Sequence, residues 1–370
     1  MRIGIDINPL LRTMTGFGRY LYNILVELLA LPESKKDKFY LYSARRRRLL
    51  PPENFILREG SGLLSNSGTL WLQTKGLSMM KKDQIDVYWG TQDIIPFGMG
   101  KQIKKILTVH DLVWHYYPKT MTYYNLLVNS IYLKRSIQIA DCIVTPTNAI
   151  KQEIVSVFDI EDEKIKVIPE AVGSEFKPIN KLNAKEVIRA KYGIEESFLL
   201  SVGTLEPRKN YLTLLEGMNL LKTNLKLVII GALGWKYRSI LKYIESNRLE
   251  DKVILPGFVS DKDLILFYNA CEIFITASVY EGFGLPVLEA MSCAVPIIAS
   301  DIPAIREVAQ DSAVYFEPDS VEKLVSSINL LIKDANLRND LSCRGLILSR
   351  MYDWRKSARL LYRTIKGLVC

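Results

Sequence analysis

The chain alternates short β-rich segments with amphipathic helical segments in two successive series, and this alternation limits its possible folds more than any other feature. The expected strands of the first series cover residues 3–7, 39–43, 87–89, 105–109, 142–145 and 166–168. Those of the second series cover residues 198–203, 226–231, 252–256, 273–277 and 296–300. Strands that alternate with helices are typical of a parallel sheet flanked by helices. The pattern therefore predicts an α/β protein with two doubly wound, Rossmann-like sheets.

Segment 168–178 interrupts the periodicity between the two series with two prolines and a glycine, which favour turns and linkers. A chain of 370 residues also exceeds what one hydrophobic core usually organises. We therefore expect a first domain over 1–172 and a second over 173–353, with ligands bound in a cleft between them. The last helical segment, 354–370, has no strand after it and is expected to pack back onto the first domain.

Positive charge is concentrated in the first part of the chain. The formal net charge is +9, and residues 1–140 hold 20 Lys and Arg against 10 Asp and Glu, whereas the remaining 230 hold 29 against 30. This asymmetry favours an anionic partner, such as a membrane surface or a phosphate-bearing acceptor. The run Arg45–Arg48 is its densest point. Nucleic acid is not expected, because no nucleic-acid-binding module is recognisable.

Membrane-spanning and disulfide-rich classes do not fit the sequence. It contains no apolar run of about 18 or more residues, and residues 1–7 have a strand pattern rather than that of a signal peptide. We expect a cytoplasmic protein, with peripheral contact at the inner membrane face as a further expectation. The five cysteines are far apart and lack paired spacing, so we interpret them as reduced thiols.

Two carboxylates eight residues apart frame a glycine-rich turn. Glu281 precedes Gly282-Phe283-Gly284, and Glu289 lies on the helical segment behind it. Because Pro286 fits a first helical turn, the unit is predicted to be strand, loop and helix. The N–H groups at such a helix start can bind phosphate or sugar oxygens, and the carboxylates can accept hydrogen bonds from hydroxyl groups. Two acids at this spacing also arise by chance, with Glu289 as an ordinary helix residue.

Arg208 and Lys209 follow the expected strand 198–203 and precede a helical pattern. A helix start disfavours cations, because its end of the helix dipole is positive. A diphosphate would supply the negative charge that these side chains need, with a bidentate fork from Arg and a compact charge from Lys. We therefore interpret both as phosphate-binding residues rather than residues that only cap the helix.

These segments resemble the retaining glycosyltransferases of family 4, which have the two-domain GT-B fold. Glu281 and Glu289 have the spacing of the family's E-x7-E motif, and segment 201–210 is similar to its diphosphate-binding loop. In that loop many members carry an Arg where this chain has Thr204. The sequence of residues 202–210 also resembles that of mannosyltransferase-like members.

Further matches follow in the family's order. Gly16-Phe17-Gly18 is similar to its first glycine loop, although a plain strand-to-helix turn is an alternative, and a third glycine for a dinucleotide fingerprint is missing. His110 matches a histidine near the transferred sugar, whereas His115 is interpreted as a surface residue. The loop that contains Val259 is similar to the one beside the nucleobase. In that loop Asp261 and Asp263 could hold a metal, but Ser260 and Asp263 fit a helix cap better, so no metal is expected.

The resemblance implies a metal-independent hexosyltransferase that moves a sugar from a nucleoside diphosphate sugar to a glycan or lipid-linked glycan in cell-envelope polysaccharide synthesis, such as that of lipopolysaccharide. It needs no cofactor. GDP-mannose is the first candidate donor, and a UDP-sugar stays open. The residues assigned to catalysis are His110, Arg208, Lys209 and Glu281. Those assigned to substrate binding are Gly16, Phe17, Gly18, Gly203, Val259, Phe283, Gly284, Leu285 and Glu289.

In the mechanism that the resemblance implies, Arg208 and Lys209 neutralise the leaving nucleoside diphosphate, Glu281 orients the donor sugar and Glu289 binds ribose hydroxyls. The acceptor hydroxyl attacks from the front face. A nucleotide-sugar epimerase of the same fold is an alternative, and it would need acid and base carboxylates in the first domain. A non-catalytic sugar-nucleotide-binding protein is another.

Overall fold

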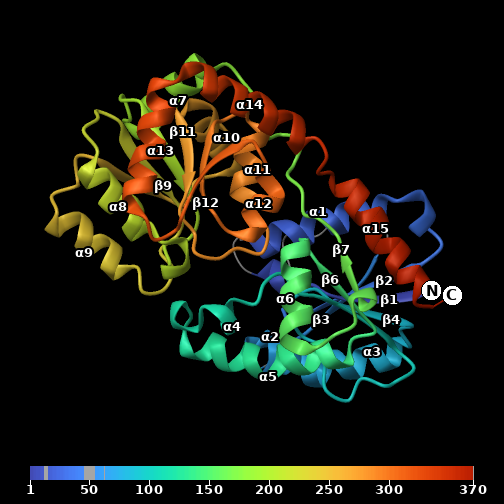
Figure 1. The fold of residues 1–370 in the computed structure, drawn as a ribbon. Coiled ribbons are helices and arrows are strands. Elements are labelled where there is room, and N and C mark those ends of the chain that lie inside the picture. The colour runs from blue at the N-terminus through green and yellow to red at the C-terminus, as the bar shows by residue number, and fades with distance from the viewer. Residues whose placement is uncertain (12–15, 46–54, 62, 370) are drawn as a thin grey trace. The chain divides into compact units, whose positions relative to one another are not determined.

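The structure is a computed structural model that describes residues 1–11, 16–45, 55–61 and 63–369 (Figure 1). The chain forms two compact units. The first contains Met1–His115, Tyr123–Ala171 and Asp353–Cys370, and the second contains Tyr116–Thr122 and Val172–Tyr352. The short segment Tyr116–Thr122 belongs to the second unit, to which the sequence analysis did not assign it.

The first unit is built on a seven-stranded parallel sheet in the order β3-β2-β1-β4-β5-β6-β7. Its strands are β1 (Arg2–Asp6), β2 (Lys38–Ser43), β3 (Phe55–Glu59), β4 (Val87–Gly90), β5 (Lys104–Thr108), β6 (Cys142–Thr145) and β7 (Ile165–Val167). All of these strands except β3 were predicted from the sequence. Every residue of β3 is only half-buried and the strand lies at the sheet edge, so it lacks the apolar run that marks a central strand.

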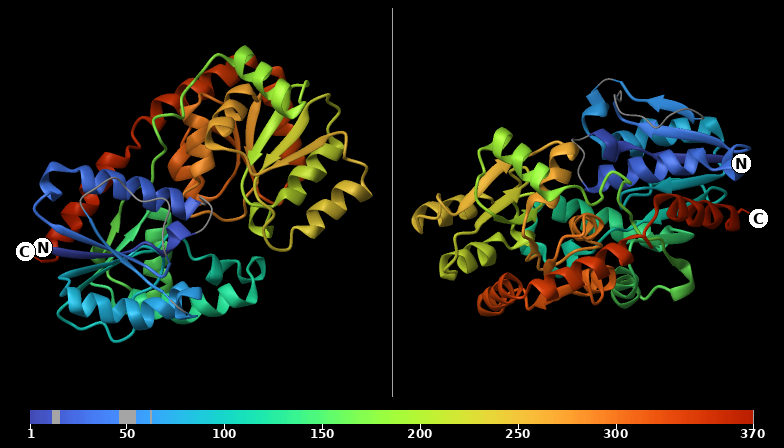
Figure 2. Two further views of the ribbon diagram at one scale, coloured as in Figure 1. Left: turned by 180° about the vertical axis from the view of Figure 1, so that it is seen from behind. Right: turned by 90° about the horizontal axis from the view of Figure 1, so that it is seen from above.

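Helices cover both faces of this sheet. They are α1 (Gly16–Ala30), α2 (Gly68–Trp71), α3 (Leu77–Asp83), α4 (Val113–Tyr116, whose last residue lies in the second unit), α5 (Tyr123–Ile139), α6 (Asn148–Phe158) and α15 (Trp354–Gly367). Shorter helical turns are η1 (Asn8–Leu11), η2 (Pro32–Ser34), η3 (Leu63–Asn66), η4 (Leu72–Gly76) and η6 (Asp162–Lys164). Figures 1 and 2 show α1 and α15 on one face, side by side, with α3 and α5 on the other.

The C-terminal helix α15 is held in the first unit by its apolar face and by polar contacts. Leu361 and Ile365 are fully buried, and the helix packs against α1. The Tyr362 hydroxyl donates to the carboxylate of Asp37 at 2.6 Å, and Arg359 donates to Glu33 at 3.0 Å. These contacts explain why the chain returns to its first unit after completing the second.

The second unit has a six-stranded parallel sheet in the order β10-β9-β8-β11-β12-β13. Its strands are β8 (Phe198–Val202), β9 (Lys226–Ile230), β10 (Val253–Gly257), β11 (Ile273–Thr276), β12 (Ile297–Ser300) and β13 (Ala313–Phe316). Its helices are α7 (Lys181–Tyr192), α8 (Tyr211–Leu220), α9 (Arg238–Ser246), α10 (Asp261–Ala270), α11 (Leu285–Ser292), α12 (Pro303–Ala309), α13 (Val321–Lys333) and α14 (Ala335–Ser349), with turns η5 (Pro118–Thr120) and η7 (Pro207–Lys209). The four-residue edge strand β13 was not predicted.

Strand β8 shows why the central strands read as continuous apolar runs. Phe198 and Leu200 enter one core, which also contains residues of α7, α10 and α11. Leu199 enters a second core with residues of α8 and α13. Because both faces of the sheet are covered, the side chains on both faces of β8 are apolar except for Ser201. The two parallel, doubly wound sheets confirm the predicted α/β fold class.

The sheet order positions the loops that matter for function. In the second unit β8 lies between β9 and β11. From β8 the chain adds strands β9 and β10 on one side of the sheet and then crosses to add β11, β12 and β13 on the other side, so the strand order switches between β8 and β11. Ligands of doubly wound sheets bind beyond the carboxyl ends of strands at such a switch point. The loops after β8 and β11 are therefore neighbours at the expected place. In the described part of the chain no helix is both long and apolar enough to cross a membrane.

Candidate functional site

The loop after β8 is shaped by a tight turn that directs two basic side chains to one place. Pro207–Lys209 forms the helical turn η7, and Asn210 ends it in the left-handed region with φ +53°. The Asn210 side chain donates to the carbonyl oxygen of Pro318 at 2.8 Å, which anchors the turn to the loop after β13. Asn tolerates this backbone conformation better than most residues. The turn thus places Arg208 and Lys209 opposite the loop after β11.

Glu281 forms ion pairs with both of these cations. Arg208 Nη1 lies 2.6 Å from Glu281 Oε2, and Lys209 Nζ lies 2.5 Å from Glu281 Oε1. Arg208 also donates to Glu206 Oε1 at 2.8 Å and to the Tyr280 carbonyl oxygen at 2.9 Å. The structure therefore brings together three predicted site residues, and adds Glu206 and Tyr280, which the sequence analysis did not assign.

Glu206 is buried and the other three charged side chains of this cluster are partly buried, and the four formal charges sum to zero. Burial by itself would raise the pKa of Glu281. The positive charges of Arg208 and Lys209 outweigh this effect and lower the pKa to about 2. The hydroxyl of Ser278, which donates to Glu281 Oε1 at 2.7 Å, acts in the same direction. Glu281 is therefore ionised at neutral pH, and it holds the two cations, a pairing that was not predicted from the sequence.

Helix α11 begins immediately after the glycine-rich turn. Its N-cap, Gly284, has φ +99°, and a Cβ at this position would lie 2.4 Å from Ile305 Cδ1. Only glycine meets both conditions without strain. The backbone N–H groups of Phe283, Gly284 and Leu285 have no hydrogen-bond partner among the described residues. They are donors at a helix N-terminus, where anions and sugar oxygens bind well.

Glu289 belongs to a different hydrogen-bond network from Glu281. Its side chain on α11 is buried, with 3% of its surface exposed, and Tyr268 donates to its Oε2 at 2.7 Å. Tyr268 comes from α10, 21 residues earlier, and nothing in the sequence indicated this partner. The two carboxylates of the motif thus have different partners: Glu281 pairs with two cations, and Glu289 accepts from a tyrosine hydroxyl.

The loop after β10 positions Val259 and caps α10. Val259 packs into the core, so its main chain is the part left for a ligand. Ser260 accepts from the backbone N–H of Asp263, and the Asp263 carboxylate accepts from Lys191 at 2.5 Å. This confirms the interpretation of Ser260 and Asp263 as a helix cap. Among the residues described, three or more His, Cys, Asp or Glu side chains are nowhere grouped as a metal site would require.

In the first unit, His110 follows β5 and contacts a carboxylate. Its Nδ1 lies 3.1 Å from Glu170 Oε1, and both side chains are buried. The rings of Phe17 and Tyr20 meet the imidazole edge-on at centroid distances of 4.8 and 4.6 Å. Burial lowers the pKa of His110, but Glu170, Asp93 and Asp111 together raise it more, so the net shift is upward.

Helix α1 begins at Gly16, so Gly16, Phe17 and Gly18 form its first turn. From the sequence, we predicted a loop here. The tertiary contact of Phe17 with His110 brings this turn beside the imidazole. Two predicted residue groups of the first unit, the glycine segment and His110, therefore lie together.

Asp93 is a residue of this region that sequence reasoning missed. It lies in the loop after β4 with φ +58°, and its N–H donates to the Thr108 carbonyl oxygen, two residues before His110. Burial raises the pKa of Asp93 to about 7, against the opposing influence of His110. Asp93 Oδ1 and His110 Nε2 are buried atoms with no hydrogen-bond partner among the described residues. Buried polar atoms of this kind call for an explanation, such as a water or ligand.

Among the described residues, those of the basic run and the cysteines lie outside these clusters. Of the run Arg45–Arg48, only Arg45 is described, and it donates to carbonyl oxygens of Ser65 and Asn66; the other three arginines lie outside the described residues. Cys142, Cys271, Cys293 and Cys343 are free thiols, and Cys370 is not described.

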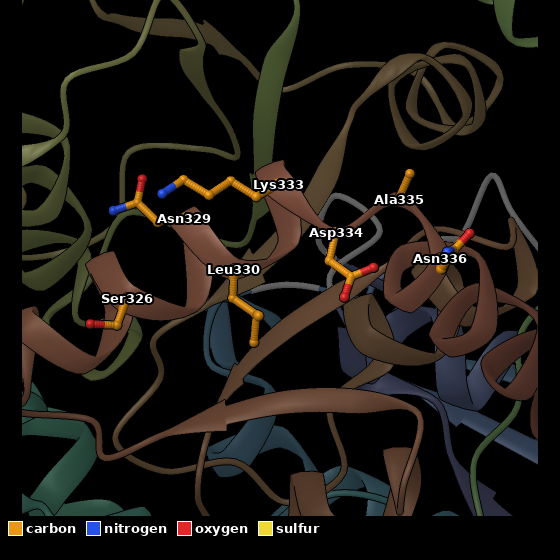
Figure 3. A pocket seen from close by; sticks show the side chains of 7 residues that line it. All are labelled: Ser326, Asn329, Leu330, Lys333, Asp334, Ala335 and Asn336. Carbon is orange, nitrogen blue, oxygen red and sulfur yellow. The ribbon is translucent and has the colours of Figure 1, made fainter.

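A surface hollow of about 580 Å³ lies at the corner where α13 ends and α14 begins. Figure 3 shows Asn329 and Lys333 extending from α13 to one side and Leu330 to another. The hollow is lined by Ser326, Asn329, Leu330, Lys333, Asp334, Ala335 and Asn336. None of these is a predicted site residue, so the hollow is separate from the charged cluster.

Comparisons with known proteins relate both parts of the chain to glycosyltransferases. The sequence model of the family described as Glycosyltransferase Family 4 matches residues 14–176, and that of Glycosyl transferases group 1 matches residues 184–345. O-antigen chain mannosyltransferase B of Escherichia coli is 26% identical over 378 residues, which cover 96% of each chain.

Solved structures share the fold. Sucrose-phosphate synthase from Thermosynechococcus elongatus has a TM-score of 0.79 at 18% identity and covers 99% of this chain and 98% of its own. The Anabaena protein Alr3699/HepE in complex with UDP-glucose has a TM-score of 0.74 at 16% identity and covers 99% of this chain and 100% of its own.

Proposed function

Because the chain belongs to the family 4-like glycosyltransferases with the GT-B fold, in the mannosyltransferase-like group, we propose that it transfers a hexose with retention of the anomeric configuration. The donor is a nucleoside diphosphate sugar, with GDP-mannose as the first candidate. The acceptor is a hydroxyl of a glycan or lipid-linked glycan of the cell envelope, in lipopolysaccharide O-antigen synthesis. The name of the E. coli relative supports mannose and O-antigen, whereas the UDP-glucose bound to the Anabaena protein keeps UDP-sugars as alternatives.

The observation that carries the proposal is the cluster of Arg208, Lys209 and Glu281 at the carboxyl ends of β8 and β11. We assign Arg208 and Lys209 to the donor diphosphate, whose negative charge grows as it leaves. Because Glu281 already holds both cations in place, they need little reorganisation when that charge develops. Glu281 is anionic and repels phosphate but accepts hydrogen bonds from hydroxyls, so we assign it to the donor sugar.

Helix α11 supplies the remaining donor contacts in this proposal. The N–H groups of Phe283, Gly284 and Leu285, which have no partner in the described part of the chain, suit phosphate or sugar oxygens. Glu289, four residues inside the helix, would accept hydrogen bonds from ribose hydroxyls while Tyr268 keeps it oriented. Neither role requires a metal or another cofactor. For the retaining step we propose front-face attack by the acceptor hydroxyl, with a leaving phosphate oxygen assisting its deprotonation.

A thermal-shift panel of GDP- and UDP-sugars tests donor binding. A ligand at about 100 times its Kd stabilises the native state by about 2.7 kcal/mol. We expect stabilisation by one nucleotide class, a loss of it in Glu289→Gln, and no loss in the control Glu245→Gln, which changes an exposed glutamate on α9. If none of the sugar nucleotides stabilises the wild-type protein, the donor assignment is wrong.

Transfer itself is tested with the donor that binds and with lipid-linked glycan acceptors, by mass spectrometry of the products. NMR of the new linkage should show the same anomer as the donor. An inverted product would refute retention. A glycosyl adduct trapped on a protein side chain would refute the front-face mechanism.

One observation favours the epimerase alternative enough to test it. Two carboxylates of the first unit, Asp93 and Glu170, are near His110, and an epimerase would need acidic and basic groups there. We expect the donor to remain unchanged when it is incubated with the enzyme in the absence of acceptor. Appearance of an epimeric sugar nucleotide in that reaction would replace the transferase proposal.

We also propose peripheral binding to an anionic membrane, through helix α5. Tyr123, Tyr124, Leu127 and Ile131 are about half exposed or more and recur at helical spacing along it. The helix has no acidic residue, and Lys134 is exposed near its end. An exposed apolar face with tyrosines and basic residues suits the lipid interface.

Vesicle flotation tests the membrane proposal. The double variant Leu127→Glu, Ile131→Glu should lose binding to vesicles that contain anionic lipid. Neutralising Arg45–Arg48 tests the contribution of the basic run. Binding that survives all of these substitutions would refute both sources of membrane affinity.

A further inference from the structure

We propose that Glu170 is a positioning residue for sugar transfer: it binds Nδ1 of His110 and thereby directs Nε2 toward a hydroxyl group of the sugar substrate. This inference rests on the proposed function. It concerns a residue for which the sequence analysis had no role.

The geometry fixes the imidazole on several sides. Glu170 Oε1 lies 3.1 Å from Nδ1, and the edges of two aromatic rings, Phe17 and Tyr20, pack against the ring. The ring of Tyr20 in turn packs against the ring of Trp354 on α15, with 5.9 Å between the ring centroids. A histidine confined in this way has little freedom to exchange its two nitrogens.

The C-terminal helix holds the segment that carries Glu170. Ser357 on α15 donates to the carbonyl oxygen of Pro169 at 2.7 Å, directly before Glu170. This segment follows β7, and β5 and β7 are both neighbours of β6, so the carboxylate and the imidazole come from the same end of the sheet. The return of the chain to its first unit therefore supports the contact between Glu170 and His110.

The chemistry of the pair determines which nitrogen is available. An ionised carboxylate only accepts hydrogen bonds, so Nδ1 of His110 must carry a proton. Nε2 is then the acceptor of the neutral imidazole, or a second donor of the protonated one, and a sugar hydroxyl can bind to either. Nε2 is a buried atom without a hydrogen-bond partner in the described part of the chain. A substrate hydroxyl would satisfy it, which removes the penalty of an unpaired buried polar atom.

Among the described residues, the charged groups that shift the pKa of His110 are all acidic. Glu170 contacts it directly, Asp93 faces it from the loop after β4, and Asp111 is the next residue in the chain. All three raise the pKa of His110 against the effect of burial. Glu170 contributes most among them, so its removal should lower the pKa of His110 more than removal of Asp93.

NMR of the imidazole nitrogens tests the inference without any activity assay. The chain contains only two histidines, His110 and His115, so the variant His115→Ala assigns the signals. In the neutral form, the wild-type His110 should carry its proton on Nδ1. Glu170→Gln, whose amide oxygen still accepts from Nδ1, should keep this tautomer but lower the pKa of His110. Glu170→Ala should lose the tautomer preference. A proton on Nε2 in the wild type, or unchanged spectra in Glu170→Ala, would overturn the proposal.

A double-mutant cycle then connects the contact with transfer. Where a histidine binds a metal, loss of the outer partner that orients its ring typically lowers function by about 10- to 100-fold, and we take this as the scale for Glu170. We expect a loss of kcat in this range for Glu170→Ala and partial rescue in Glu170→Gln. In the His110→Ala background, Glu170→Ala should have no further effect. Additive losses would mean that Glu170 acts independently of His110 and would refute positioning. If the wild type transfers no sugar, the proposed function fails, whereas the NMR result still decides whether Glu170 orients His110.

Discussion

Replacing Glu281 by Gln should destabilise the second unit, by an amount that follows from its ion pairs. The pKa of this carboxyl is about 2 in the folded protein against an ordinary value of 4.5. A difference of one unit corresponds to about 1.4 kcal/mol, so ionised Glu281 contributes about 3 kcal/mol. Loss of one partner of a buried ion pair commonly costs about 3–5 kcal/mol, which agrees with this value.

The pH dependence of this effect has a definite sign. Because the pKa is lower in the folded state, the contribution of Glu281 is complete above its unfolded pKa, near pH 4.5. It decreases as the pH falls and disappears below the folded pKa, near pH 2. The difference in unfolding free energy between wild type and Glu281→Gln should therefore be about 3 kcal/mol at pH 7 and about 1.4 kcal/mol at pH 3.

Urea unfolding followed by hydrogen-exchange mass spectrometry measures this difference, since peptides of the second unit report on it separately from the first. Glu245→Gln is the matched control, because Glu245 is exposed, and it should change stability by less than about 0.5 kcal/mol. A Glu281→Gln protein as stable as the wild type at pH 7 would refute the reasoning. So would a difference that does not shrink between pH 5 and pH 3.

Three further predictions concern other parts of the fold. The pKa of Asp93 is raised to about 7, so its ionisation destabilises the first unit as the pH rises from about 4 to 7; Asp93→Asn should therefore stabilise this unit by about 1 kcal/mol or more at pH 8 and not at pH 4, as measured by urea unfolding. Gly284→Ala should lower the stability of the second unit by about 1–3 kcal/mol and weaken sugar-nucleotide binding in calorimetry, because the new Cβ would clash with Ile305 and φ at this position is positive. The control Gly193→Ala is also at positive φ but its Cβ would enter open space, so it should destabilise the protein less. Trp354→Ala should destabilise the first unit by about 3–5 kcal/mol and increase amide exchange in α1, while peptides of the second unit keep their protection.

Much of the site could be predicted from the sequence because its parts are local. Glu281, Gly284 and Glu289 lie within one strand–loop–helix unit, and Arg208 and Lys209 lie within one turn. Local segments of this kind carry their conformational requirements in their own residues, such as a glycine at positive φ or a proline in a first turn. The same reason explains why Ser260 was correctly interpreted as a helix cap.

Contacts between distant segments could not be predicted in the same way. Arg208 and Glu281 are 73 residues apart, and His110 and Glu170 are 60 apart. Whether such pairs meet depends on the order of strands in the sheet, which no single segment encodes. Asp93 was missed for this reason, because its raised pKa comes from burial in the folded first unit, which its neighbours in the chain do not reveal.

The sequence by itself determined the alternation of strands and helices, the central strands, and the residues able to bind phosphate and hydroxyl groups. Their apolar runs and turn residues express short-range physical requirements. Only the tertiary structure decided that Glu281 pairs with Arg208 and Lys209, that Glu289 pairs with Tyr268, and that the last helix supports Glu170. The physical reason is that an ion pair or a pKa depends on distance and burial in space, and these follow from sheet order and packing.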